Sequence, residues 1–314
     1  MSTLTLNDGA SIPLLAYGTG TTLLKNKRSR ATGGDPMALD RTVIEHIKTA
    51  IRLGYRHLDT AEMYQTEPET RVAINESIAE GIVKREDLFV TTKISSNFTQ
   101  VQNAIDASLK NLGLAYVDLY LLHSPYWTDS DADLQRAWKD MEAVKESGKA
   151  RSIGVSNYSQ THLSATLATA RIPPSINQIE FHPYMRQGDV VPVAFSHSHS
   201  NIATSAYGAL APVTRNIPGP LDQTLESLAK KYGVSTGLIC LRWCIDQDIV
   251  VITTSEKETR MKEYLTVFDF KLTDGEVQEI SDRGTESVGG KELVPRVIRY
   301  YRSLKEKDAG GKAQ

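Results

Sequence analysis

Short, almost continuously apolar runs alternate along most of the chain with longer stretches in which apolar residues recur every three or four positions. A strand buried on both faces is a short apolar run, whereas a helix packed on one side shows the three-to-four-residue spacing. The pattern therefore predicts strands that alternate with helices. The predicted strands are Leu14–Tyr17, His57–Asp59, Leu88–Thr92, Leu119–His123, Ser152–Ser156, Ile176–Glu180, Ile202–Tyr207 and Ile249–Thr254.

Four of the intervening stretches have the spacing of amphipathic helices: Leu39–Leu53, Val101–Leu112, Leu134–Ser147 and Leu221–Tyr232. Repeated strand–helix units are typical of a parallel sheet. Because there are eight of them, we expect the sheet to close on itself, which gives an α/β fold of the (β/α)8 TIM barrel class. No stretch has the composition of a linker, so we predict a single domain over residues 1–314.

Three segments depart from this repeat. Residues 1–12 contain Asn-Asp-Gly between two alternating runs, which predicts a β-hairpin ahead of the barrel, at its floor. Residues 25–40 are rich in basic residues, Gly and Pro, and we interpret them as a long loop after the first barrel strand. Residues 308–314 contain a Gly-Gly pair and are predicted to form a mobile tail.

The chain has 314 residues, of which 40% are hydrophobic and 24% charged, and its formal net charge is −2. Such a composition is typical of soluble proteins, and a nearly neutral chain has no broad positive field for nucleic acid or an anionic membrane. No apolar run is long enough to span a bilayer and the first residues lack the plan of a signal peptide, so we expect a cytoplasmic protein. Cys240 and Cys244 share one predicted helical face and are interpreted as packed core residues.

In a (β/α)8 barrel, reactive side chains converge at the carboxyl ends of the strands. Each polar residue at these ends has an ordinary explanation when taken alone, such as a solvated lysine, a core histidine, a packing tyrosine or an aspartate that caps a helix. Their joint placement on one rim favours a catalytic site. The rim residues are Asp59, Tyr64, Lys93, His123, Asn157, Gln178, Tyr207 and Thr254.

Four of these residues can act together on a carbonyl group. An ion pair between Asp59 and Lys93 keeps the lysine charged, and an ammonium group nearby lowers the pKa of a phenol such as that of Tyr64. Tyr64 and His123 can both donate hydrogen bonds to a carbonyl oxygen, and Tyr64 can then supply a proton. Since no side chain carries hydride, an external donor is needed, and nicotinamide cofactors are the usual ones. We assign no metal to this site.

Several motifs at these positions resemble those of the aldo-keto reductases. They are HLDTAEMY at 57–64, TK at 92–93, LYLLHS at 119–124, GVSN at 154–157 and NQIEFHP at 177–183, and the match spans nearly the whole chain. Within that superfamily, GTGT at 18–21, HSP at 123–125, AWKDME at 137–142 and VITTS at 251–255 resemble the fungal conjugated polyketone and α-keto amide reductases. The resemblance implies that Tyr64 is the acid/base, that Asp59 and Lys93 tune it, and that His123 orients the carbonyl.

The resemblance also implies an NADPH site and a substrate pocket. Ser156, Asn157 and Gln178 are expected to hold the carboxamide of the cofactor and Tyr207 to stack on its nicotinamide ring. Most relatives carry Trp after the Gly-Thr pair, whereas this chain has Thr22, so one wall of the pocket is expected to be less aromatic. The remaining residues assigned on this basis are Gly20 and Thr21 beside the cofactor, and Met63, Tyr126 and Trp127, together with Thr22, around the substrate.

The segment after the last predicted strand carries the expectation of NADPH over NADH. Ser255 and Glu258 have the spacing of a capping box, and a helix that begins there offers free N–H groups to a phosphate. Arg260 matches the arginine that the superfamily places on the 2′-phosphate or the adenine, while Thr254 stands where a lysine is usual. Lys257 and the hydroxyls of Thr254 and Ser255 are further candidate contacts.

Other functions remain open at this point. A metal-dependent hydrolase would use Asp59, His123 and His182 as ligands, although Lys93 would repel the cation. A non-catalytic cofactor-binding barrel and a sugar oxidoreductase of the aldose or arabinose type are further alternatives. The isolated glycines at 18–20 lack the third glycine of a Rossmann fingerprint. We predict activated ketones or aldehydes as substrates, in particular α-keto amides, α-keto lactones and diketones, and a monomer or weak dimer without nucleic-acid or membrane partners.

Overall fold

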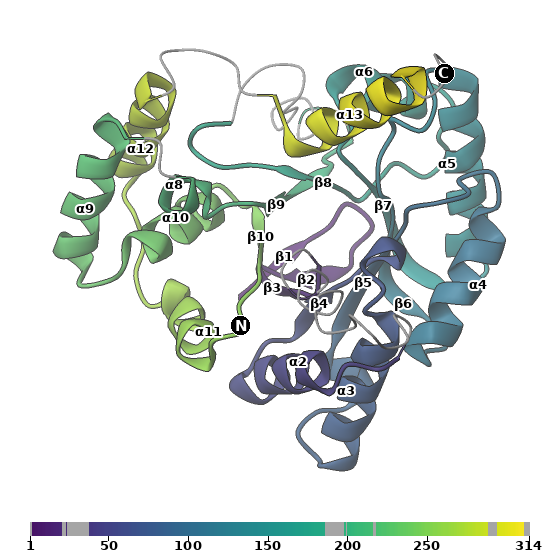
Figure 1. Ribbon diagram of the computed structural model, residues 1–314, viewed down its shortest axis with the longest axis horizontal. Helices are drawn as coiled ribbons and strands as arrows, with labels where there is room; N and C mark the ends of the chain where they lie inside the picture. Colours follow the sequence, from purple (N-terminus) through teal and green to yellow (C-terminus); the bar gives the residue numbers. More distant parts are fainter. Residues whose placement is uncertain are drawn as a thin grey trace.

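The computed structural model of the chain describes residues 2–20, 23, 38–185, 198, 200–215, 218–287 and 294–310, with side chains to 303. Eight parallel strands close into a barrel in the order β10-β3-β4-β5-β6-β7-β8-β9 (Figure 1). Every predicted barrel strand is found within a few residues of its expected bounds, so the (β/α)8 prediction is confirmed. The strands are β3 (Leu15–Gly18), β4 (His57–Asp59), β5 (Phe89–Ile94), β6 (Val117–Leu122), β7 (Ala150–Ser156), β8 (Ile176–Glu180), β9 (Ala203–Tyr207) and β10 (Val250–Thr253).

Helices surround the barrel and cover the outer face of its strands (Figure 1). No helix among the described residues is long and apolar enough to cross a membrane. The α-helices are α2 (Arg41–Leu53), α3 (Glu67–Ala79), α4 (Val101–Leu112), α5 (Asp131–Glu146), α6 (Gln160–Leu167), α8 (Ala211–Thr214), α9 (Pro220–Tyr232), α10 (Thr236–Ile245), α11 (Glu258–Leu265), α12 (Asp274–Ser287) and α13 (Arg296–Gly310). The described residues also form three short 3-10 turns, η1 (Glu62–Tyr64), η2 (Arg85–Asp87) and η3 (Thr266–Phe268).

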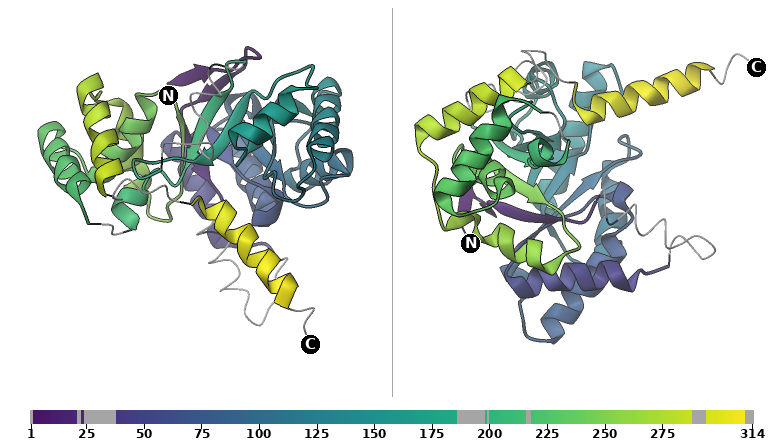
Figure 2. Two further views of the ribbon diagram at one scale, coloured as in Figure 1. Left: turned by 90° about the horizontal axis from the view of Figure 1, so that it is seen from above. Right: turned by 60° about the vertical axis from the view of Figure 1, so that its left-hand side comes forward.

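The predicted hairpin forms from β1 (Thr3–Thr5) and β2 (Ser11–Pro13), which pair antiparallel with Leu4 opposite Ile12. Gly9 has a φ of +86°, a left-handed conformation that glycine adopts without strain and that the tight turn requires. Leu6 and Ile12 are buried against the barrel. The hairpin lies at the end of the barrel opposite to α13 (Figure 2), so it closes the floor and leaves the other end for a site.

Several boundaries differ from those predicted. Helix α5 begins at Asp131 rather than at Leu134, because its first turn is polar and Ser130 caps it by accepting from the Asp133 N–H at 3.3 Å, which an apolar spacing cannot register. Helix α13 continues to Gly310, three residues into the segment predicted as a mobile tail, and 311–314 lie outside the described residues.

Two further expectations concern the loop predicted after the first barrel strand and the two cysteines. Of the predicted loop 25–40, residues 25–37 lie outside the described residues. Asp40 caps α2, because its Oδ1 accepts from the Thr42 N–H at 2.9 Å. Cys240 and Cys244 are fully buried in α10, so their interpretation as core residues is confirmed.

Candidate active site

Asp59 and Lys93 form a buried ion pair at the carboxyl ends of β4 and β5. The two strands are neighbours in the barrel, and the Lys93 Nζ donates to Asp59 Oδ1 at 2.6 Å and to the Thr60 carbonyl at 2.8 Å. Lys93 is fully buried and Asp59 is 2% exposed. A lysine in such a place is tolerated because its charge is paired and hydrogen-bonded. The predicted pair is therefore present in the structure.

Tyr64 lies above this pair. It ends the turn η1, and the Lys93 Nζ is 5.0 Å from the centre of its ring. The ring packs directly on Gly20, where an added Cβ would lie only 2.7 Å from it, so any larger residue at that position would push the tyrosine out of place. A glycine is therefore needed at position 20 to leave space for the phenol ring of Tyr64.

The electrostatics of Tyr64 correct one expectation. Burial raises the pKa of the Tyr64 phenol above its ordinary value, and the nearby charge of Lys93 opposes this only in part. The sequence predicted a lowered pKa because it indicated the ammonium group but not how strongly the surrounding protein excludes water from the phenol. The consequence is that Tyr64 keeps its proton at neutral pH.

His123 follows β6 and faces Tyr64. The two rings meet edge to face, with centres 5.6 Å apart and planes at 80°. Burial, assisted by the charge of Lys93, lowers the pKa of His123 well below its ordinary value. The imidazole is therefore neutral at pH 7 and has one N–H to donate. Its Nδ1 lies 2.7 Å from the Ser95 hydroxyl.

The side chains at the ends of β7, β8 and β9 form one hydrogen-bonded set. Asn157 has a φ of +63° and its Nδ2 donates to the His123 carbonyl at 2.9 Å. The Tyr207 hydroxyl donates to Asn157 Oδ1 at 2.7 Å, and the Ser156 hydroxyl donates to the Gln178 carbonyl at 2.8 Å. Gln178 Nε2 donates to Asp59 Oδ2 at 2.9 Å, which links this set to the ion pair.

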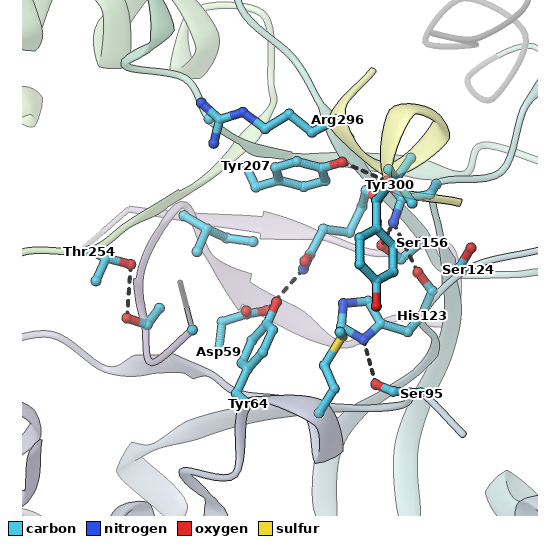
Figure 3. A pocket seen from close by; sticks show the side chains of 18 of the residues that line it. Asp59, Tyr64, Ser95, His123, Ser124, Ser156, Tyr207, Thr254, Arg296 and Tyr300 are labelled. Atoms are coloured by element: carbon cyan, nitrogen blue, oxygen red, sulfur yellow. Dashed lines mark hydrogen bonds between the residues drawn. The ribbon is translucent and has the colours of Figure 1, made fainter. Parts of the chain in front are cut away.

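A cavity of about 810 Å³ opens between these groups. Figure 3 shows Tyr64 and His123 on one side of it and Tyr207 across from them. Of the predicted site residues, those that line it are Gly20, Asp59, Met63, Tyr64, His123, Trp127, Ser156, Asn157, Gln178, Tyr207 and Thr254. The described part of the structure thus brings together most of the residues predicted from their places at the strand ends and from the resemblance to the aldo-keto reductases.

Tyr126 is not among the lining residues, so its assignment to the pocket is not met by this cavity. Its ring packs instead against His162 and Tyr301, with centres 5.3 and 5.7 Å away. Trp127 does line the cavity and is stacked on Phe98 with ring centres 5.0 Å apart. Thr21 and Thr22 lie outside the described residues.

Among the lining residues that sequence reasoning missed, two groups contribute side chains from segments that the predicted site did not include. One group follows β5, where the rule that selected Lys93 could have been extended to the next residues of the loop. The other comes from the start of α13, which lies 116 positions beyond the end of β8 and has no local pattern that points to the cavity. Glu180, at the end of β8, accepts there from the Arg296 N–H at 2.7 Å. The missed residues include Ser95, Ser96, Asn97, Phe98, Arg296, Val297, Tyr300 and Tyr301.

The region after β10 corrects the predicted capping box. Helix α11 begins at Glu258 with Lys257 at its N-cap, and Ser255 accepts from the Lys257 N–H at 3.1 Å in a local turn instead of capping the helix. A serine can bond to the backbone two residues ahead, and this turn competes with a cap. Thr254 donates from its hydroxyl to the Gly18 carbonyl at 2.9 Å, while Lys257 and Arg260 are exposed at the helix start.

Within the described part of the chain, no three His, Cys, Asp or Glu side chains are grouped so that they could hold a metal ion. His182, which the hydrolase alternative requires, is not part of the cavity wall. Its Nε2 lies 3.7 Å from Glu180 Oε1.

Comparison with known proteins agrees with this geometry. Residues 18–283 match the family described as "Aldo/keto reductase family". The chain belongs to this family and is an oxidoreductase on a (β/α)8 barrel. It is similar to the NAD/NADP-dependent indole-3-acetaldehyde reductase of Schizosaccharomyces pombe (36% identity, covering 88% of this chain and 94% of that protein).

Two further relatives bear on the cofactor. The NADPH-dependent alpha-keto amide reductase of Saccharomyces cerevisiae is 36% identical, with 90% of each chain covered. The crystal structure of the Bombyx mori aldo-keto reductase AKR2E4 in complex with NADP superimposes with a TM-score of 0.77 at 39% identity, covering 90% of this chain and 92% of that one. The predicted resemblance to the aldo-keto reductases is confirmed.

Proposed function

We propose that the protein is an NADPH-dependent reductase of activated ketones and aldehydes, with Tyr64 as the proton donor. The observation that carries this proposal is the convergence of Tyr64 and His123 on one cavity, with the Asp59–Lys93 pair buried directly behind them. All four positions needed for carbonyl reduction are filled, which argues against a non-catalytic cofactor-binding barrel.

The chain's own groups account for orientation and proton transfer. A neutral His123 donates an N–H to the carbonyl oxygen, and Tyr64, which retains its proton because burial raises its pKa, donates from its hydroxyl. Both donors face the oxygen on which negative charge develops. When Tyr64 gives up its proton, the ammonium of Lys93, 5.0 Å from the ring centre, stabilises the phenolate that remains.

The residues of the cavity also fit a nicotinamide cofactor. The Tyr207 ring offers a flat face, and Ser156, Asn157 and Gln178 offer amide and hydroxyl groups suited to a carboxamide. The cofactor supplies the hydride when it is bound. We assign Gly20, Thr21, Thr254 and Ser255 to its surroundings and the exposed side chains of Lys257 and Arg260 to its 2′-phosphate.

The substrate class is proposed from the walls of the cavity and from the name of the yeast relative. Met63, Phe98, Trp127 and Tyr300 give the mouth an apolar and aromatic lining. A sugar needs many hydrogen-bonding partners, whereas an α-keto amide, α-keto lactone or diketone has few polar groups and a carbon made reactive by the adjacent carbonyl. This contrast favours activated carbonyls over the aldose or arabinose alternative.

The test is a substrate panel on the purified protein with NADPH, which compares α-keto amides, α-keto lactones, isatin and simple aldehydes with xylose and arabinose. We expect a higher kcat/KM for the activated carbonyls. Comparable values for the two pentoses would contradict the substrate class. Binding of NADPH without turnover of any carbonyl would contradict the reductase function altogether. The cytoplasmic location and the monomeric or weakly dimeric state remain predictions.

A further inference from the structure

Ser95 makes a contact to the imidazole of the site that the motifs do not indicate. It directly follows β5, and its Oγ lies 2.7 Å from Nδ1 of His123. The His123 backbone N–H donates to the Ile94 carbonyl at 3.1 Å, so the ends of β5 and β6 run side by side at this point. Figure 3 shows the bond between Ser95 and one ring nitrogen of His123, on the opposite edge of the ring from the nitrogen that faces the cavity.

The position of Ser95 is fixed by the turn that carries Tyr64. Glu62 begins this turn, and its Oε2 accepts from the backbone N–H of Ser95 at 2.9 Å and of Ser96 at 3.2 Å. The Ser96 hydroxyl donates to the other oxygen of the same carboxylate. One side chain therefore ties the loop after β5 to the turn of Tyr64, and the Ser95 hydroxyl keeps a fixed place relative to both catalytic rings.

A neutral imidazole carries a proton on only one of its two nitrogens, and the partner of Nδ1 decides which. If Ser95 donates to Nδ1, the proton is on Nε2 and points into the cavity. If Ser95 accepts, Nε2 has only a lone pair, which would attract the Tyr64 proton instead of a carbonyl oxygen. Among the described residues, His123 Nδ1 is the group hydrogen-bonded to the Ser95 hydroxyl, so donation to it is what satisfies the O–H.

We infer that Ser95 is a positioning residue that holds His123 in the tautomer with its proton on Nε2, ready to donate to the substrate carbonyl. This inference rests on the proposed role of His123 as the group that orients the carbonyl. The hydroxyl acts only through the imidazole.

The experiment measures the tautomer directly, by ¹⁵N NMR of histidine-labelled protein without substrate, and pairs it with kcat and cofactor affinity. The variants are Ser95→Ala, which removes the hydroxyl, Ser95→Thr, which restores it, and Thr99→Ala, which removes the hydroxyl of an exposed residue of the same loop that does not line the cavity. We expect the His123 signals of a protonated Nε2 in wild type, Ser95→Thr and Thr99→Ala, and a mixture of tautomers in Ser95→Ala. The loss of one hydrogen bond predicts a kcat lower by roughly 3- to 10-fold in Ser95→Ala, restored by Ser95→Thr, with cofactor affinity unchanged.

Three outcomes would overturn the inference: a wild-type His123 with its proton on Nδ1, unchanged nitrogen signals in Ser95→Ala, or equal changes in Ser95→Ala and Thr99→Ala, which would indicate a general effect of the loop. The NMR measurement does not depend on turnover. A protein that holds the expected tautomer and reduces no carbonyl would therefore contradict the proposed function and leave the role of Ser95 intact.

Discussion

Two histidines of the barrel, His57 toward its floor and His123 at its rim, differ in how many hydrogen-bond partners they have. His57, on β4, uses both ring nitrogens: Nδ1 is 3.3 Å from the Pro13 carbonyl of the hairpin and Nε2 is 2.9 Å from the Thr91 hydroxyl. His123 has a described hydrogen bond at Nδ1 only. Burial lowers the pKa of both imidazoles, that of His57 to about 4, so both are neutral at pH 7. They differ in their hydrogen bonds: both ring nitrogens of His57 have a partner, whereas Nε2 of His123 is left to bind a ligand.

Two aspartates, Asp118 near the floor of the barrel and Asp59 at its rim, show the same contrast. Asp118, at the start of β6, accepts from Arg85 at 2.7 Å, from the Val90 N–H at 2.9 Å and from Arg151 at 3.3 Å, which saturates it. Asp59 accepts from a lysine and an amide and borders the cavity. Saturated groups at the floor stabilise the fold, whereas groups at the rim keep a side open for chemistry.

The largest effect is expected for Tyr64→Phe. The ring still packs on Gly20, but the proton donor is lost, and general-acid catalysis is commonly worth roughly 10²- to 10⁴-fold in rate. We expect kcat to fall by that factor while the dissociation constant of NADPH stays nearly the same. A variant with near wild-type kcat would remove Tyr64 from the mechanism.

The ion pairs of these two aspartates, Lys93–Asp59 at the rim and Arg85–Asp118 near the floor, can be compared by the variants Lys93→Met and Arg85→Met. Lys93→Met leaves the Asp59 carboxylate buried without its partner, which costs about 3 to 5 kcal/mol for a buried pair, and it removes the charge that stabilises the phenolate, so activity should be lost as well. Arg85→Met should lower the free energy of unfolding with little change in kcat. Urea unfolding and steady-state kinetics on both variants provide the measurement. An active Lys93→Met enzyme would disprove the tuning role.

The pH dependence of stability tests whether the pKa of His57, whose two ring nitrogens both have hydrogen-bond partners, is lowered in the folded protein. A histidine in the unfolded chain has a pKa near 6.5, whereas that of folded His57 is lowered to about 4, so the unfolded state takes up a proton first. Stability is therefore greatest above about pH 6.5 and falls as the pH drops toward 4, by about 3 kcal/mol from this residue.

Urea unfolding at pH 7 and pH 4.5 measures this loss, and His57→Gln should reduce it. An NMR titration of His57 in the folded wild type gives a second readout that does not require the variant to fold. A His57 that titrates near pH 6.5 in the folded protein would rule out this account.

A smaller effect than that of Tyr64→Phe is expected for Arg260→Ala. Arg260 is exposed, and its guanidinium can bind a phosphate bidentately, so its loss should lower kcat/KM for NADPH by roughly 5- to 20-fold and leave that for NADH unchanged. Lys262→Ala, on the same helix and paired with Glu258 at 2.9 Å, is the matched control. Equal losses with both cofactors would show that this helix start does not read the phosphate.

Much of the fold and of the proposed catalytic set followed from local patterns. The strands were found because burial on both faces leaves a short apolar run, and Asp59, Lys93 and His123 were found because strand ends meet at one rim. The sign of the pKa shift at Tyr64 was wrong, since the sequence indicates a neighbouring charge but not the degree of burial. The contribution of Arg296 and Tyr300 was missed because α13 reaches the cavity from the far end of the chain.

By itself, the sequence determined the order of strands and helices, the closed barrel and the residue types at its rim, because these depend on periodicities of two to four residues. Only the tertiary structure decided which polar groups at the rim have all their hydrogen-bond partners within the protein and which are left to bind a ligand. The bond between Ser95 and His123, the contact between Gly20 and the Tyr64 ring and the packing of Tyr126 away from the cavity depend on angles between separate loops. A small rotation of either loop would break such contacts without changing any local pattern, so only the packed molecule specifies them.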